Sequence, residues 1–374
     1  MRISGVDRKK LVAAMEHCLS LGKETDATLH ASDSGLDVEA TATDRSASVR
    51  TSVSCDVEDA ESIVVNAASL RRALDTLKKS STLTSWTTDN SLIVANDVAT
   101  MKLHAQEVGD GSHVRDAVSP IIHVRAGRVA TALRRVLHAA PVKGDRPGLR
   151  GVHVTLASES DGVLRVTATD GFRLGTHEIH VSLTMDAEIG RLNVLRQGCT
   201  IHRTGAACLD SVLRHADTGA WTTISLSSTN DRVSFDVGSS SISTMVLDEK
   251  FHRIARGSLR SSDRMRAVLS LPRKTIESAS KMLMKNKVQY AVVTSKDGTC
   301  GLRGEVESDE ESTSVTLGRC DAEAEFKLKL RYLLDAVSCL DAEDVVLNVY
   351  DNYVVIGEDD PLTSMQIIAF IKPS

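Results

Sequence analysis

Residues 121–140 read IIHVRAGRVATALRRVLHAA, and this stretch contains the plan on which the whole chain is built. Its first residues are typical of a short alternating β-strand, and a polar turn follows. Val129, Ala132, Leu133 and Val136 then fall at i, i+3, i+4 and i+7, which is the spacing of the apolar stripe of an α-helix. The stretch therefore predicts a strand, a turn and an amphipathic helix.

Five other segments follow the same plan, and successive segments start roughly 60 to 80 residues apart. They read ISGVDRKKLVAAMEHCLSL from Ile3, SIVVNAASLRRALDTLKKS from Ser62, CTIHRTGAACLDSVLRHAD from Cys199, VLSLPRKTIESASKMLMKN from Val268 and FKLKLRYLLDAVSCLDAED from Phe326. Helices of about three turns are marginal alone, so each must pack its stripe on a sheet. Between the helices the apolar period becomes two, which predicts several antiparallel strands after each helix.

A second repeat indicates how the six modules are grouped. SDSGLDVEATATDRS from Ser32 is similar to ESDGVLRVTATDGFR from Glu159, including the shared Ala-Thr-Asp that ends at Asp44 and Asp170. Modules one and three thus hold the same place in successive pairs. We expect an α+β protein of three similar domains, residues 1–120, 121–262 and 263–374, each made of two β-α-β-β-β modules.

Composition limits the classes of function. The chain has 41% apolar and 25% charged residues, as in a soluble globular protein. The start turns polar within a few residues, no apolar stretch could span a membrane, and the seven cysteines include no CxxC pair, so we expect a cytoplasmic protein with reduced thiols. A net charge of -5 argues against DNA binding by affinity alone, but not against DNA binding by topology.

Several predicted helices carry arginine or lysine opposite their apolar stripe. These cations are Arg71, Arg72, Lys78, Lys79, Arg128, Arg134, Arg135, Arg203, Arg214, Lys274 and Lys281. Each could simply keep a solvated helix face soluble. Their recurrence on equivalent helices instead predicts a basic surface that contacts the phosphates of duplex DNA without reading its sequence.

No site for catalysis or for a metal emerges from the motifs. The chain contains no GxxxxGK[ST], GxGxxG or GxSxG pattern. His177 and His180 lie in an alternating strand, where this spacing points the two rings to opposite faces. We therefore expect a protein that is not an enzyme and has no catalytic residue, cofactor or metal ligand of its own.

Residues 145–179, DRPGLRGVHVTLASESDGVLRVTATDGFRLGTHEI, resemble the second domain of the bacterial DNA polymerase III beta subunit, the sliding clamp. The family patterns RPxLxGV and ATDGHRL are matched by residues 146–152 and 168–174, with Phe172 in place of the histidine. The similarity extends more weakly over the whole chain, including the late helix RYLLDAVSCL. The chain is thus identified as a divergent relative of this family.

The resemblance implies a crescent of three domains that closes into a ring as a head-to-tail homodimer. Such a ring encircles double-stranded DNA independently of sequence and makes the replicative polymerase processive. Its partners would be the DNA polymerase III catalytic subunit, a clamp loader and other proteins with a clamp-binding motif, with no role for a membrane. The alternative is a paralogue with the clamp fold that acts as a protein-interaction scaffold without loading on DNA.

The resemblance also implies site residues. The pocket for partner peptides would comprise Leu149, Thr169, Gly171, Phe172, Arg173, Leu174, Ile367 and Ala369. Lys23 and Lys143 occupy places where family members contact DNA. Met282 and Leu283 lie where the family has an apolar dimer contact, although they could equally be core residues of the fifth helix.

The predicted pocket departs from the family at three points. Phe172 replaces a histidine, Phe251-His252 replaces Phe-Pro, and Ala369 replaces a methionine. Such a pocket stays apolar but changes shape. We therefore expect a partner motif that is not interchangeable with the common one.

Overall fold

The computed structural model describes all residues except 78–81, 89, 109–118, 144–145, 185–188, 250, 252–264, 306–312, 359–362 and 372–374. The chain divides into two compact units. Unit 1 comprises Met1–Thr131, Val154–Val163 and His180–Asp248, and unit 2 comprises Ala132–His153, Leu164–Ile179 and Glu249–Ser374. The finer division into three domains at residues 120 and 262 stays a prediction.

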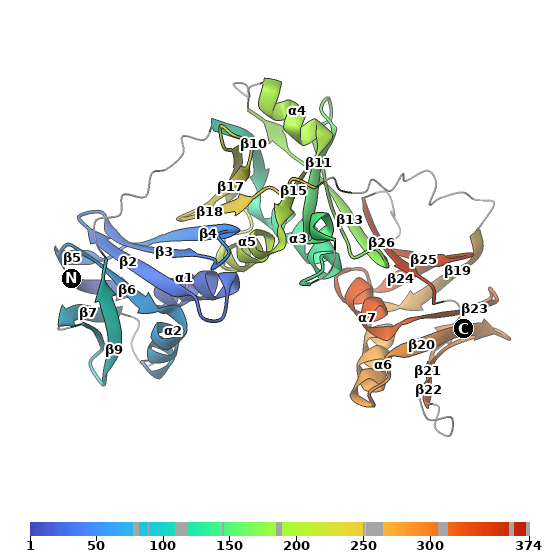
Figure 1. Ribbon diagram of the computed structural model, residues 1–374. Coiled ribbons are helices and arrows are strands. Elements are labelled where there is room, and N and C mark those ends of the chain that lie inside the picture. Colours follow the sequence, from blue (N-terminus) through green and yellow to red (C-terminus); the bar gives the residue numbers. More distant parts are fainter. Residues whose placement is uncertain are drawn as a thin grey trace. The chain divides into compact units, whose positions relative to one another are not determined.

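All six predicted strand–helix pairs are confirmed (Figure 1). They are β1 (Arg2–Asp7) with α1 (Arg8–Leu21), β6 (Glu61–Asn66) with α2 (Ala67–Thr76), β10 (Ser119–Arg125) with α3 (Ala126–Val136), β15 (Cys199–His202) with α5 (Arg203–His215), β19 (Met265–Pro272) with α6 (Arg273–Lys285), and β23 (Ala324–Lys329) with α7 (Leu330–Ser338).

The antiparallel strands expected after each helix are also present. In chain order they are β2 (Asp26–Ser32), β3 (Gly35–Thr41) and β4 (Ala47–Val53); β7 (Thr82–Thr88), β8 (Ser91–Ala95) and β9 (Thr100–Glu107); β11 (Gly151–Ser158), β12 (Val163–Thr169) and β13 (Arg173–His180); β16 (Trp221–Leu226), β17 (Arg232–Val237) and β18 (Ser240–Met245); β20 (Tyr290–Lys296), β21 (Thr299–Glu305) and β22 (Thr313–Arg319); and β24 (Asp344–Tyr350), β25 (Tyr353–Gly357) and β26 (Ser364–Ala369). The sequence did not predict β5 (Asp56–Asp59), β14 (Ser182–Leu183), α4 (Ile189–Gln197) or the short 3₁₀ turns Leu137–Ala139 and Pro147–Leu149.

Local sequence explains where several helices begin. The carboxylate of Asp7 accepts hydrogen bonds from the backbone amides at the start of α1, and Asn66 and His202 do the same for α2 and α5. These side chains satisfy amides that have no partner inside the helix. The predicted stripe of α3, from Val129 to Val136, is buried.

Unit 1 contains a 14-stranded sheet in the order β14-β10-β16-β17-β18-β4-β3-β2-β6-β9-β8-β7-β1-β5. The antiparallel pairing of β18 with β4 joins strands of the second module pair to those of the first. Helix α1 packs against α2, α5 and the sheet. Across the β4–β18 pair, the Nδ1 of His17 lies 3.1 Å from the hydroxyl of Thr51, which lies 3.0 Å from that of Ser240. Strand pairing, helix packing and these hydrogen bonds thus join the two module pairs within unit 1.

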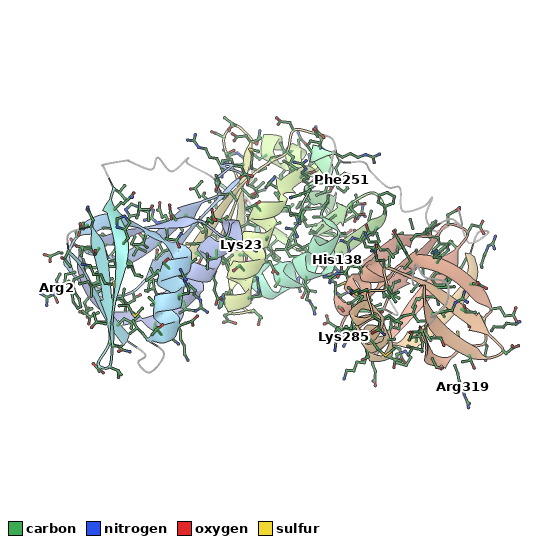
Figure 2. All side chains as sticks on the ribbon, turned by 60° about the horizontal axis from the view of Figure 1, so that its bottom comes forward. Arg2, Lys23, His138, Phe251, Lys285 and Arg319 are labelled. Atoms are coloured by element: carbon green, nitrogen blue, oxygen red, sulfur yellow. The ribbon has the colours of Figure 1, made fainter. Side chains whose placement is uncertain are left out.

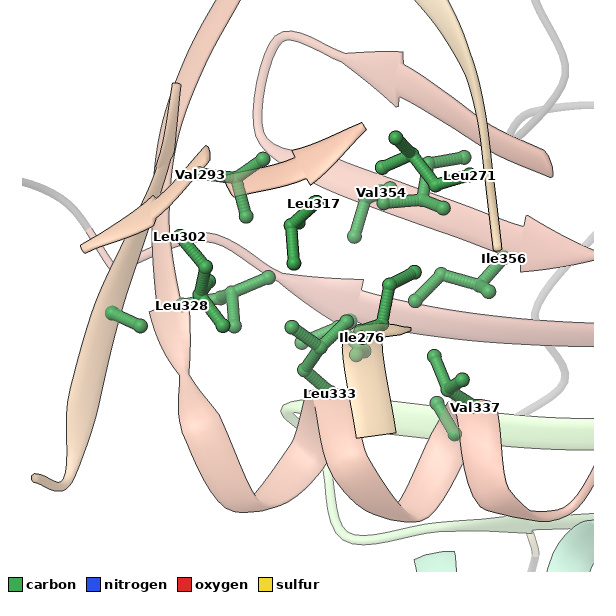
Figure 3. Close-up of a cluster of buried hydrophobic side chains, with 14 of the residues drawn as sticks. Leu271, Ile276, Val293, Leu302, Leu317, Leu328, Leu333, Val337, Val354 and Ile356 are labelled. Atoms are coloured by element: carbon green, nitrogen blue, oxygen red, sulfur yellow. The ribbon is translucent and has the colours of Figure 1, made fainter. Parts of the chain in front are cut away.

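Unit 2 has its core between strands and the helix pair α6 and α7 (Figure 1). Its sheets are β22-β21-β20-β23 and a run of neighbours in the order β13-β26-β25-β24-β19. Figure 3 shows Leu333 and Val337 of α7 pointing into a cluster that includes Leu328 and Ile356. Full burial of one such side chain stabilises the fold by about 1.5–3 kcal/mol.

Two buried histidines, His17 and His177, and the half-buried His138 predict that acid destabilises the fold. Burial lowers the pKa values of His17, His138 and His177 to about 4. The unfolded chain therefore binds more protons than the folded chain below about pH 6.5, and stability is lost as the pH falls from there towards 4. We expect a loss on the order of 5 kcal/mol in the free energy of unfolding between about pH 7 and pH 5.

Urea titrations at the two pH values measure this loss. The variant His177→Gln should flatten the pH dependence, whereas His180→Gln, which changes an exposed side chain of the same strand, should leave it unchanged. A wild-type free energy of unfolding that is the same at both pH values would contradict the prediction that these histidines make the fold sensitive to acid.

Candidate functional site

The turn between β12 and β13 is tightly specified by its own side chains. Asp170 accepts hydrogen bonds from the backbone amides of Phe172 (2.9 Å) and Arg173 (3.0 Å). The hydroxyl of Thr169 donates to the carbonyl of Arg173 at 2.6 Å and accepts from the amide of Gly171 at 3.0 Å. Gly171 has φ +92°, a backbone conformation that strains any residue with a Cβ. The turn therefore favours glycine at this position.

Arg173 ties this turn to helix α7. Its guanidinium bonds the carboxylates of Asp170 at 3.0 Å and Asp335 at 2.7 Å, and it lies over the ring of Tyr332 at 4.3 Å. The side chains of the arginine and both acids are mostly buried, at 14% exposure each. Arg173 therefore positions the turn, and a ligand would have to displace a carboxylate to pair with it.

The structure brings the other predicted pocket residues close to this turn. Strand β26 pairs with β13 so that Leu174 lies opposite Ile367. The amide of Ala369 donates to the carbonyl of Phe172 at 2.9 Å. Arg146 also approaches the turn, because a Cβ on Gly171 would lie 3.8 Å from its guanidinium.

These residues differ sharply in exposure. Leu149, Leu174 and Ile367 are buried at 5–7% exposure, whereas Phe172 is 67% exposed. Leu174 and Ile367 belong to an apolar cluster with Tyr350, Val355 and Met365. A docking partner would therefore meet the exposed phenyl ring first and reach only the edges of the buried side chains.

The segment at Glu249 and Phe251, which the resemblance places at the pocket wall, packs against residues 148–153 of unit 2. The ring of Phe251 stacks on His153 with centroids 4.4 Å apart and planes 3° apart. The carboxylate of Glu249 accepts a hydrogen bond from the amide of Gly148 at 2.7 Å. His252 lies outside the described residues.

Three of the predicted DNA-facing arginines are held in ion pairs of 3.1 Å or less, whereas Arg214 pairs more loosely with Asp210, at 3.4 Å. Arg71 pairs with Glu16 at 2.9 Å and with Asp75. Arg134 forms two bonds to Asp341, at 2.7 and 2.6 Å. Arg135 is buried and pairs with Asp341 and with Glu358, at 3.1 and 3.0 Å. The two arginines hold the pKa of Asp341 at about 2. These three cations stabilise the fold, and their charge is compensated locally.

The other predicted cations are more open to solvent. Exposed ones are Lys23, Arg72, Arg128, Lys143, Arg214, Lys274 and Lys281, while Arg203 is half-buried. Figure 2 labels Lys23, and Lys285, which also projects from α6. Lys78 and Lys79 lie outside the described residues. Sequence reasoning overlooked Lys9 and Lys10, which are exposed in the first turn of α1. Their position directly after the capping Asp7 was the available signal.

Met282 and Leu283 have different environments. Met282 is 41% exposed on α6, whereas Leu283 is fully buried in the core cluster of unit 2. Burial favours the core alternative for Leu283. Of the two side chains, Met282 is the one that a partner subunit could touch.

No group of three or more His, Cys, Asp or Glu residues that could hold a metal ion occurs in the part of the chain that the structure describes. His177 is buried and His180 is exposed, as expected for opposite faces of a strand. All seven cysteines are free, and burial raises the pKa of Cys18, Cys199 and Cys339 to about 12. No helix among the described residues is long and apolar enough to cross a membrane.

Solved structures resemble the chain over its entire length. The DNA polymerase III beta subunit of Thermotoga maritima has a TM-score of 0.79 at 15% identity, and each chain is covered to 100%. The chain has the fold of a DNA sliding clamp. The sliding clamps of Bacillus subtilis (TM-score 0.77, 16% identity) and of Bartonella birtlesii, bound to griselimycin (TM-score 0.77, 19% identity), are also covered to 100%, as is this chain. No protein-family model and no curated protein matches the sequence.

Within this clamp fold, the turn at Asp170 should depend on its carboxylate. Asp170→Asn removes a charged acceptor of two amides and of the Arg173 guanidinium, so we expect the free energy of unfolding to fall by about 1–3 kcal/mol. The matched control is Asp44→Asn, because Asp44 ends the same Ala-Thr-Asp motif and accepts a hydrogen bond from the amide of Ser46 at 2.9 Å, but forms no ion pair with any arginine among the described residues. Urea denaturation at neutral pH measures both, and equal losses would contradict the role of the arginine.

Proposed function

We propose that this chain is a DNA sliding clamp, a non-catalytic processivity factor for a replicative DNA polymerase. The observation that carries the proposal is the likeness of fold to sliding clamps over the full length of both chains. Two copies would join head to tail into a ring around double-stranded DNA. Since the chain contains no nucleotide-binding motif, an ATP-driven clamp loader would open that ring.

The charge distribution supports DNA binding by topology rather than by affinity. The chain carries a net charge of -5, so its overall field does not attract a polyanion. The cations Arg72, Lys274 and Lys281 are nevertheless exposed on helices. Weak contacts of this kind follow phosphates without reading bases, and they allow a ring to move along the duplex.

The turn at Asp170–Arg173 supports a second part of the proposal, the docking of partner peptides. The rigid backbone of the turn presents the exposed ring of Phe172 beside strand β26. A rigid site loses little entropy when a ligand binds, and an exposed aromatic ring is a typical anchor of an interface. The polymerase catalytic subunit, the loader and other proteins with a clamp-binding motif would use this site in turn.

Retention on circular DNA tests encirclement directly. The chain is loaded on nicked circular plasmid with the clamp loader of its own organism, and gel filtration at rising salt separates bound from free protein. A ring should remain on circles at high salt and leave once the plasmid is cut. Binding that fades at modest salt on both forms would instead favour the protein-interaction scaffold. Sedimentation of the free protein checks the expected dimer independently.

The helix cations predict how weak binding to open DNA depends on salt. Arg72, Lys274 and Lys281 changed together to Gln should reduce the slope of log affinity against log salt for a linear duplex, by about one for each phosphate that the variant no longer neutralises. The control changes Lys102, Lys296 and Arg319 to Gln, which removes the same charge from exposed positions on strands. Equal slopes for the two variants in fluorescence anisotropy would show that the helix positions have no special role.

A further inference from the structure

A group of cations and aromatic rings lies next to the docking turn in unit 2. We call it the basic aromatic surface; it consists of Tyr290, Lys327, Lys329, Arg331 and Tyr332. Lys327 and Lys329 project from the edge strand β23, where Lys329 is opposite Tyr290 of β20. The Nζ of Lys327 lies 5.7 Å from the ring centroid of Tyr290, and that of Lys329 lies 5.0 Å from that of Tyr332.

The turn and this surface are parts of one continuous structure. Arg173 of the turn lies on the ring of Tyr332, so that ring contacts a cation of the turn and a cation of β23. The chain after β26 connects the two as well. The amide of Ala369 donates to the carbonyl of Phe172, and that of Ile371 donates to the carbonyl of Lys327, both at 2.9 Å.

At Lys329 positive charge is in excess. The nearby carboxylates of Asp170 and Asp335 are both bonded by Arg173. Asp335 also accepts a bond from Arg331 at 2.9 Å. Among the described residues no carboxylate forms an ion pair with Lys329. Its ammonium group instead forms a cation–π contact with the ring of Tyr332. In a chain with a net charge of -5, such a local excess attracts an anionic group.

The position of these cations favours a peptide over DNA as the occupant. The helix cations lie on α2 and α6, whereas Lys327 and Lys329 lie on a strand, beside the turn that presents the exposed Phe172. An apolar anchor with cations beside it is complementary to an apolar peptide segment with acidic neighbours. The positive surface ends at Glu325, two residues before Lys327 on the same face of β23.

We propose that the basic aromatic surface recognises acidic residues that flank the apolar docking motif of a partner peptide. The inference rests on the proposed peptide-docking function and specifies the chemistry of the ligand. The apolar anchor would lie against Phe172 and the edge of β26. Carboxylates beside it would then reach Lys327 and Lys329, and Tyr290 and Tyr332 would keep both ammonium groups in place.

Two labelled synthetic peptides test this preference by fluorescence anisotropy. They share one apolar anchor, taken from the docking segment of the polymerase catalytic subunit of the same organism, and carry either three Glu or three Gln at both ends, so that the result does not depend on chain direction. At low salt the Glu-flanked peptide should bind about fivefold more tightly, and the difference should disappear at high salt.

Matched variants assign the preference to the surface. Lys327→Gln with Lys329→Gln should abolish the difference while binding of the Gln-flanked peptide is unchanged, which also shows that the variant is folded. Lys285→Gln with Lys296→Gln removes the same charge from other exposed positions of unit 2 and should keep the difference.

Equal affinity of wild type for the two peptides would overturn this inference alone. A preference for the Glu-flanked peptide that persists in the Lys327 and Lys329 variant would also overturn it. If the same variant lost its binding to a linear duplex, the surface would be assigned to DNA instead. No binding of either peptide would overturn the proposed docking function together with this inference.

Discussion

Short helices that cannot stand alone impose the constraint on which the rest of this structure depends. A helix such as α2, with ten residues, is marginal in water, and it persists because Leu70, Ala73 and Leu74 are buried. Each helix must therefore turn one stripe towards a sheet. Polar and charged residues are left to the opposite side, so burial of the apolar stripe decides which cations reach solvent. The possible DNA contacts thus follow from the same pattern that builds the core.

The cations on those helices serve two different purposes. Arg71 and Arg135 have carboxylates within 3.0 Å, and removing one partner of such a pair leaves a costly charge behind. Arg72 and Lys274 are exposed, so substituting them should cost the fold little stability. Most partners of the paired arginines lie far away in the sequence: Glu16 is 55 residues from Arg71, and Glu358 is 223 residues from Arg135. Asp75 is the exception, because it follows Arg71 by one helical turn. Local spacing could therefore mark Arg71 as paired but not Arg134 or Arg135, whose partners come from distant parts of the chain.

The sequence predicted what local periodicity controls. All six strand–helix pairs and the strands after them come from an apolar spacing that every module repeats. Helix α4 was missed because its residues have no clear apolar stripe, and β5 and β14 are too short for a period of two to register. The site was predicted as a set of positions, but not by role. The role of Arg173 depends on the carboxylates of Asp170 and of Asp335 on α7, and the burial of Leu283 depends on the core of unit 2. Neither can be read from the local sequence.

Net charge and local charge make separate demands on a clamp-fold protein. A ring that stays on DNA by closure needs no strong attraction to phosphate, so a net charge of -5 is compatible with that function. The same negative field makes any local positive excess more selective, because anions are repelled elsewhere. Lys329 lies at such a place, one ring away from Arg173, whose own charge is already shared between Asp170 and Asp335. The arginine therefore fixes the geometry of the turn, and Lys329 keeps its charge available for a partner.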